Sequence, residues 1–99
     1  MKLRWTRLAL GDLKDIHGYI AERNPVAALK VARLLRAHAE GLAAYPEKGR
    51  LGRVEGTREQ AIPGMPYVIA YRVTETTVDI LAIRHGARDW AVSIPDAKD

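Results

Sequence analysis

Two apolar, β-prone runs lie next to each other near the end of the chain, and they limit most strongly how it can fold. The runs cover residues 67–73 and 77–84, and only Thr74, Glu75 and Thr76 separate them. A connection of this length is typical of an antiparallel hairpin. Apolar side chains occupy both faces of each run, as in strands covered on both sides. The sequence therefore predicts a central hairpin of which both faces are covered.

The first half of the chain predicts the cover of one face, a pair of antiparallel helices. Thr6 is an N-cap residue, and apolar residues follow it at helical spacing, at positions 9, 13, 16 and 20. Asn24 and Pro25 give the cap and first-turn signals of a second helix that closes near residues 41–46. We expect Gly18 to let another helix come close.

Two further strands complete the expected sheet. Leu3 and Trp5 alternate with Lys2 and Arg4, the pattern of a short edge strand, and residues 57–62 form another β-prone run. The prediction is an α+β fold: an N-terminal strand, a helical hairpin, then a three-stranded antiparallel meander. The second face of the meander is left for the C-terminal tail, a partner, or both. We expect one domain over residues 1–92 and a frayed tail over 93–99.

Composition restricts the function. Sixteen Lys and Arg against 12 Asp and Glu give a formal net charge of +4, which favours an acidic partner, either nucleic acid or protein. The chain has no cysteine and only three histidines, so we expect no disulfide, metal or cofactor. No secretory signal and no run near the ~18 apolar residues of a membrane span is present, which predicts a cytoplasmic protein without membrane contact.

Arginines gather around a glycine-rich connection. Arg50, Arg53 and Arg58 lie within nine residues there. Guanidinium groups bind phosphates and carboxylates well, so this cluster either contacts a partner or forms a solvated loop.

His85 follows the last β-prone run and is a candidate general acid or base. With Glu59, Arg58 and Arg88 it could form a metal-free ribonuclease site. The alternative is that His85 and Arg88 only hold the C-terminal turn.

Aromatic side chains offer a further means of contact with a partner. Trp5 and Tyr71 lie in alternating runs and are expected in the core. Trp90 follows the last run, where it either covers the exposed sheet face or grips a partner.

This order of elements resembles the RelE/ParE superfamily of toxins from type II toxin-antitoxin systems. The resemblance spans residues 3–90 and rests on Asp12-Leu13, Tyr19-Ile20, Asn24-Pro25, Leu42 with Pro46, Gly49-Arg50, Tyr67, Tyr71-Arg72-Val73, and Ile83-Arg84-His85 followed by Arg88. It implies a toxin that a cognate antitoxin neutralises. Operator DNA is then contacted only through the antitoxin.

The superfamily has two branches that differ in target. RelE-like toxins cleave mRNA in the ribosomal A site, whereas ParE-like toxins inhibit DNA gyrase and are often described as plasmid stabilisation proteins. RelE-like ribonucleases commonly carry an arginine at the start of the third strand, in an Arg-Leu-Val-Tyr type run. Here Val68 takes that position. Such a guanidinium would stabilise charge during phosphoryl transfer, so its absence favours the ParE-like branch.

The ParE-like reading assigns no catalytic residue. Its candidate contacts with the target or the antitoxin are Arg50, Arg53, Arg58, Arg72, Arg84, His85, Arg88 and Trp90. The alternative is a ribosome-dependent mRNA endonuclease, for which the candidate catalytic residues are Arg58, Arg72, His85 and Arg88.

Overall fold

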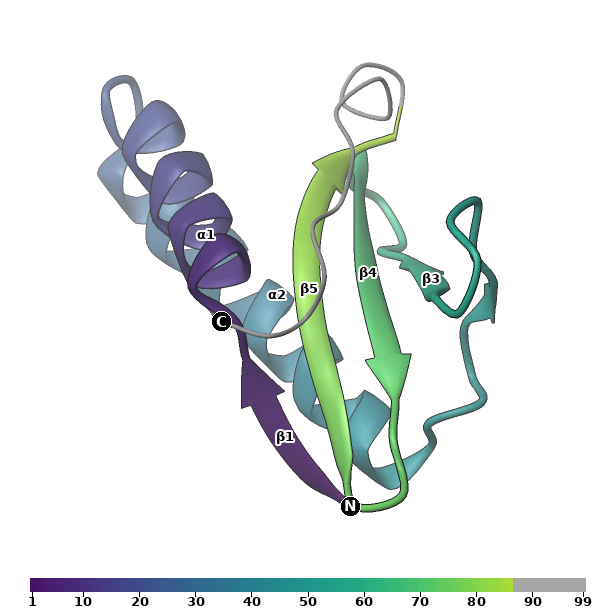
Figure 1. Cartoon of the computed structure of the whole chain (residues 1–99). Helices are drawn as coiled ribbons and strands as arrows, with labels where there is room; N and C mark the ends of the chain where they lie inside the picture. Colours follow the sequence, from purple (N-terminus) through teal and green to yellow (C-terminus); the bar gives the residue numbers. More distant parts are fainter. Residues whose placement is uncertain (87–99) are drawn as a thin grey trace.

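The computed structural model describes residues 1–86, and residues 87–99 lie outside the described part. A five-stranded sheet has the strand order β1-β5-β4-β3-β2 (Figure 1). Strand β1 pairs parallel with β5, and the other pairs are antiparallel. In chain order the elements are β1 (Lys2–Trp5), α1 (Arg7–Ala21), α2 (Pro25–Ala44), β2 (Arg50–Leu51), β3 (Arg58–Ala61), β4 (Tyr67–Val73) and β5 (Thr77–His85).

The predicted α+β fold, with an N-terminal strand, a helical hairpin and an antiparallel meander, is confirmed. Both helix starts follow their capping signals: Thr6 accepts a hydrogen bond from the Ala9 N–H, and Asn24 accepts one from the Ala27 N–H. Strand β2 was not predicted, since two residues carry no periodic signal.

The hydrophobic core lies between the helices and one face of the sheet, which we call the helix face (Figure 1). Tyr71 and Ile80 are paired across β4 and β5, and both are fully buried on this face. The helices contribute Ala9, Leu13, Leu35, Ala39 and Leu42. Trp5 packs against this cluster, as predicted. The apolar stripes of the two helices, which supply these core residues, therefore face the sheet.

The opposite face of the central strands is also buried. Val68, Ala70, Leu81 and Ala82 are each at most 7% exposed. A β-bulge between Ala70 and Tyr71 changes the register of β4 against β5. The C-terminal tail, which was one of the expected covers of this face beside a partner, lies outside the described part of the chain.

Beyond the end of β1, the start of helix α1 supplies the hydrogen-bond partners along the edge of β5. The Thr6 N–H and hydroxyl both donate to the Ile80 carbonyl, at 3.1 and 2.8 Å. Six residues further along the chain, the Asp12 carboxylate accepts from the Ile83 N–H at 2.9 Å. These bonds satisfy backbone groups that β1 no longer reaches. They fix the start of α1 against the end of the sheet.

The expectation for Gly18 was wrong. A Cβ added at Gly18 would meet no described atom within 4 Å outside its own stretch of helix, so no helix comes close there. Within the described residues, neither helix is long and apolar enough to span a membrane.

Candidate interaction site on the sheet

Ionic side chains gather on the sheet face that points away from the helices, which we call the charged face. Cross-strand partners share a face of a sheet, and the register places these side chains together on that face: Arg4, Arg50, Glu59, Arg72, Asp79 and Arg84.

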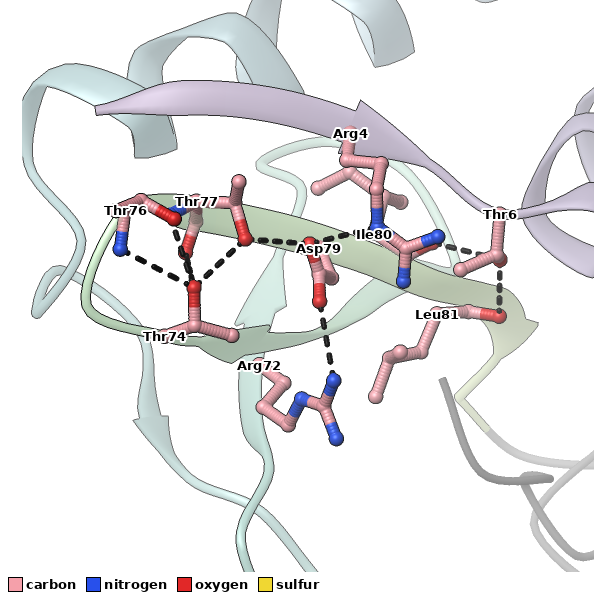
Figure 2. A network of polar contacts seen from close by, with 9 residues as sticks. All are labelled: Arg4, Thr6, Arg72, Thr74, Thr76, Thr77, Asp79, Ile80 and Leu81. Atoms are coloured by element: carbon pink, nitrogen blue, oxygen red, sulfur yellow. Dashed lines mark hydrogen bonds and ion pairs between the residues drawn. The ribbon is translucent and has the colours of Figure 1, made fainter. Parts of the chain in front are cut away.

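Asp79 is the centre of a network that joins three neighbouring strands (Figure 2). Its Oδ1 accepts from Arg4 Nε of β1 at 3.0 Å and from the Thr77 hydroxyl at 2.8 Å. Its Oδ2 accepts from Arg72 Nη2 of β4 at 3.2 Å. The Asp79 side chain is 3% exposed, while those of Arg4 and Arg72 are 36% and 41% exposed. One buried carboxylate thus holds two arginines that still reach solvent.

The electrostatics of this network favour an ionised Asp79. Burial acts to raise the pKa of Asp79, but hydrogen bonds from Arg4, Thr77 and Arg72 together outweigh burial and hold this pKa below its usual value. Two guanidinium groups against one carboxylate leave one positive charge in excess. This part of the charged face therefore attracts anionic groups.

Glu59 makes a second centre at the other side of the sheet. Its Oε1 accepts from Arg50 Nη2 at 3.2 Å, and its Oε2 accepts from the backbone N–H of Arg53 at 2.7 Å. The Arg53 side chain adds a looser ion pair at 3.9 Å. Glu59 is 1% exposed, whereas Arg50 and Arg53 are 66% and 50% exposed. The carboxylate fixes the glycine-rich connection and leaves both arginines accessible.

The Arg58 side chain is hydrogen-bonded to the connection between α2 and β2. Its Nη1 donates to the Gly49 carbonyl at 2.7 Å. The Gly49 N–H donates to Tyr71 Oη, which donates to the Pro46 carbonyl, each bond at 2.8 Å. Burial raises the pKa of Tyr71, opposed by the Gly49 bond and by the charge of Arg58. A Cβ at Gly49 would clash with the Tyr71 ring, which explains a glycine there. Arg58 therefore has a structural partner.

Arg84 and His85 line a pocket of about 350 Å³ at the end of β5, whose other wall is α1 with Asp12, Asp15 and Tyr19. Arg84 Nη1 lies 3.8 Å from Asp12 Oδ2, and its buried Nε has no described hydrogen-bond partner. His85 packs edge-on against Tyr67, with ring centroids 6.1 Å apart. Arg84 is thus a buried residue, not an exposed contact.

Glu59 and His85, which were considered together for a ribonuclease site, do not lie together in the described part of the chain. Glu59 pairs with Ala70, and Ala70 with Ala82, on the charged face, whereas His85 pairs with Tyr67, which packs on the helix face. His85 is three residues beyond Ala82 and two strands from Glu59, which is roughly 10 Å along and roughly 10 Å across the sheet. Glu59 and His85 therefore cannot act as an acid–base pair on one bound group.

Two candidates, Arg88 and Trp90, lie outside the described residues, so their predicted contacts remain predictions. Among residues 1–86, no group of three or more His, Cys, Asp or Glu side chains could hold a metal ion.

Sequence reasoning missed Asp79, Asp12 and Arg4 as members of ionic sites. The signal for Asp79 was present, since it is the only acidic residue in an otherwise apolar run. A carboxylate in such a run indicates cationic partners on adjacent strands.

Residues 3–90 match the model of a protein family, the ParE toxin of the type II toxin-antitoxin system parDE. The chain belongs to this family. Toxin RelE2 of Caulobacter vibrioides is 44% identical to it over 84 residues, covering 85% of this chain and 93% of that relative. Toxin RelE1 of the same organism is 38% identical over 78 residues, covering 76% and 82%.

A solved structure supports the same assignment. A chain of the chromosomal ParDE toxin-antitoxin system from P. aeruginosa superposes on this ParE-family chain with a TM-score of 0.79 at 30% identity, covering 86% of this chain and 95% of that one. The protein is therefore a type II toxin of the ParE/RelE family. Membership in this family implies an antitoxin partner.

Proposed function

We propose that this ParE-family toxin acts by binding DNA gyrase and inhibiting supercoiling, without catalysing a reaction of its own. A cognate antitoxin neutralises it. Because gyrase works on cytoplasmic DNA, the proposal includes a cytoplasmic location, where the toxin would serve plasmid stabilisation.

One observation carries the proposal: of the polar groups considered for RNA cleavage, Glu59 and Arg58 already have structural partners, and His85 lies on the other face of the sheet from Glu59. Glu59 and His85 lie on opposite faces, and Arg58 is bonded to the Gly49 carbonyl. RNA cleavage needs a base, an acid and a cation around one phosphate. An interaction surface requires only that such groups be displayed.

Val68 adds support. It stands where RelE-like ribonucleases commonly carry an arginine, and it is 7% exposed on the charged face. Its partner across the sheet is Arg84, which is also buried. At this point of the sheet, no guanidinium group is accessible to stabilise a phosphoryl group during its transfer.

The test is supercoiling of relaxed plasmid by gyrase with increasing toxin. We expect supercoiling to fall as toxin is added and to recover when purified antitoxin is present in excess. Full supercoiling at a several-fold molar excess of folded toxin over gyrase would contradict the proposal.

The second candidate is a ribosome-dependent mRNA endonuclease. Two observations favour it: the names of the Caulobacter relatives, Toxin RelE2 and Toxin RelE1, and the pocket that His85 shares with Asp12 and Asp15. It predicts cleavage of mRNA on ribosomes that the double variant His85→Ala, Arg88→Ala loses. Undiminished growth arrest by this variant would count strongly against an endonuclease.

A further inference from the structure

The charged face carries two centres that are built in the same way, each a buried carboxylate with two partly exposed arginines. Their members are Asp79 with Arg4 and Arg72 (Figure 2), and Glu59 with Arg50 and Arg53. Each centre therefore has one positive charge in excess. Because both carboxylates are almost fully buried, solvent meets the guanidinium groups rather than the acids that hold them. Both centres are thus suited to binding an anion.

Arg72 and Arg50 keep hydrogen-bond donors for such an anion. In the described contacts, each uses one guanidinium nitrogen, Nη2, to bind its carboxylate. A guanidinium group has five N–H donors in a fixed geometry, which suits the oxygens of a phosphate. The buried Nε of Arg72 has no described hydrogen-bond partner, and an unsatisfied donor favours an acceptor from outside the chain. Since the carboxylates already orient both side chains, binding costs less conformational entropy.

The strand register sets the distance between the two centres. Arg72 lies two residues from Ala70 on β4, Ala70 pairs with Glu59 of β3, and Glu59 pairs with Arg50 of β2. The backbone positions of Arg72 and Arg50 are therefore roughly 7 Å apart along the strands and roughly 10 Å apart across them. Because each guanidinium group is held at its own carboxylate, one phosphate does not bridge both. The two centres fit a polyanion, which has negative charges at regular intervals.

The apolar residues of this face favour nucleic acid over an acidic protein. Val68, Ala70, Leu81 and Ala82 are buried here, so these side chains offer no apolar anchor. Protein–protein interfaces have an apolar or aromatic centre, whereas protein–DNA interfaces are polar, wet and positively charged. The exposed arginines match the second kind of interface.

The aromatic residues of the sheet favour a duplex over a single strand. Proteins that bind single-stranded nucleic acid stack its bases on aromatic side chains. Among residues 1–86, the aromatic residues of the strands are Trp5, Tyr67 and Tyr71, and all three pack on the helix face. The described part of the charged face thus has arginines for phosphates but no ring for a base.

We propose that the charged face binds the phosphate backbone of duplex DNA, and that this DNA is the duplex on which gyrase acts. The inference rests on the proposed function and extends it, because the toxin would contact the substrate as well as the enzyme. Arg72 and Arg50 each contact a different phosphate. Phosphate contacts carry no sequence information, so binding is independent of base sequence.

NMR of isotope-labelled toxin tests the location of the surface. The probe is a short blunt-ended duplex of mixed sequence at low ionic strength, where weak phosphate contacts are not screened. The backbone amide and Nε–H signals of Arg72 and Arg50 should shift as duplex is added, while those of Arg33 on the exposed surface of α2 should stay. Shifts confined to α2, or no shift at excess duplex, would overturn the proposal. The same shifts at lower concentrations of single-stranded RNA would overturn the choice of duplex.

A first variant measures the contribution of the Asp79 centre. Arg72→Gln leaves Asp79 bonded to Arg4, so the buried carboxylate keeps a cationic partner. The variant should weaken duplex binding roughly fivefold to tenfold near about 0.1 M salt and should reduce the salt slope by roughly one. The matched control is Arg33→Gln, which removes the same charge from an exposed position of α2. Equal losses in both variants would show that only net charge matters and would overturn the binding surface.

A second variant measures the Glu59 centre independently. Arg50→Gln leaves Glu59 bonded to the Arg53 N–H, and circular dichroism checks that the variant folds. We expect the same loss of affinity as at the first centre, and multiplied losses when both are combined, because sites this far apart act independently. Unchanged binding by Arg50→Gln would contradict a surface with two centres.

Supercoiling assays with these variants separate this inference from the proposed function. Weaker inhibition by both variants than by Arg33→Gln, in proportion to weaker duplex binding, supports the inference. Inhibition by a toxin that binds no duplex would refute it and leave gyrase inhibition standing. Duplex binding with unaffected supercoiling would refute gyrase as the target and gyrase-bound DNA as the ligand. Variants that lose inhibition but bind duplex like the wild type would show that the charged face contacts gyrase itself, against the proposed DNA ligand.

Discussion

Different interactions stabilise the two faces of the sheet. On the helix face, buried apolar side chains of β4 and β5 pack against the helical hairpin, with Tyr71 and Leu35 fully buried. On the charged face, two carboxylates, Asp79 and Glu59, bind arginines from neighbouring strands. Apolar burial supplies most of the stability of a domain, whereas partly exposed ion pairs contribute little and leave charge available. We infer that the helix face maintains the fold and that the charged face is suited to partners.

The largest effect should come from the helix face. Leu35→Ala removes a fully buried side chain from the core and should lower the free energy of unfolding by about 2 to 5 kcal/mol. Urea denaturation followed by circular dichroism measures it. A loss below about 1 kcal/mol would mean that the helices are not packed on the sheet as described.

A smaller loss should follow at the edge of the same face. Tyr71→Phe keeps the ring but leaves the Gly49 N–H and the Pro46 carbonyl without their partner, which should cost about 1 to 3 kcal/mol. Since burial raises the pKa of Tyr71, its stabilising effect is complete below about pH 10 and is lost as pH rises through the folded-state value. The difference between wild type and variant should therefore shrink in strongly alkaline solution.

The charged face should respond less. Asp79→Asn removes the charge that holds two partly exposed arginines, and we expect a loss of about 1 kcal/mol at pH 7, because solvent still stabilises both guanidinium groups. The pKa of Asp79 is lowered in the fold, so its contribution is present above about pH 4 and is lost as pH falls through the folded value. Denaturation at pH 7 and pH 3 should show the difference shrinking. A larger difference in stability between wild type and variant at pH 3 than at pH 7 would contradict a lowered pKa of Asp79.

The smallest effect is a gain of stability on the outer surface of the hairpin. Gly18→Ala places a Cβ where no described atom lies within 4 Å outside its own stretch of helix, so the variant should gain up to about 1 kcal/mol from helix propensity alone. A thermal scan checks the direction. A lower melting temperature would show that something occupies this space.

The helix face could be predicted from sequence because its signals are local. The spacing of apolar residues gave both helices, Thr6 and Asn24 gave their starts, and the run ending at Val73 gave β4 to the residue. Each signal lies within a few residues of what it predicts. Periodicity therefore sufficed for the fold.

The charged face could not be predicted in the same way, because its contacts depend on strand register. Arg4 and Asp79 are 75 residues apart and meet only through the parallel pairing of β1 with β5. Glu59 and His85 could have formed one site as far as the sequence showed, but register places them on opposite faces. Shifting a strand by one residue would exchange those faces, and no local pattern specifies that choice.

Gyrase inhibition is tested most directly by comparing two reactions with one preparation of toxin. Gyrase supercoiling of relaxed plasmid and cleavage of ribosome-bound mRNA are titrated side by side at equal toxin concentrations. We predict that supercoiling is lost while the mRNA stays intact. Cleavage of mRNA in the A site with unaffected supercoiling would contradict it and would make His85 and the neighbouring arginines an active site.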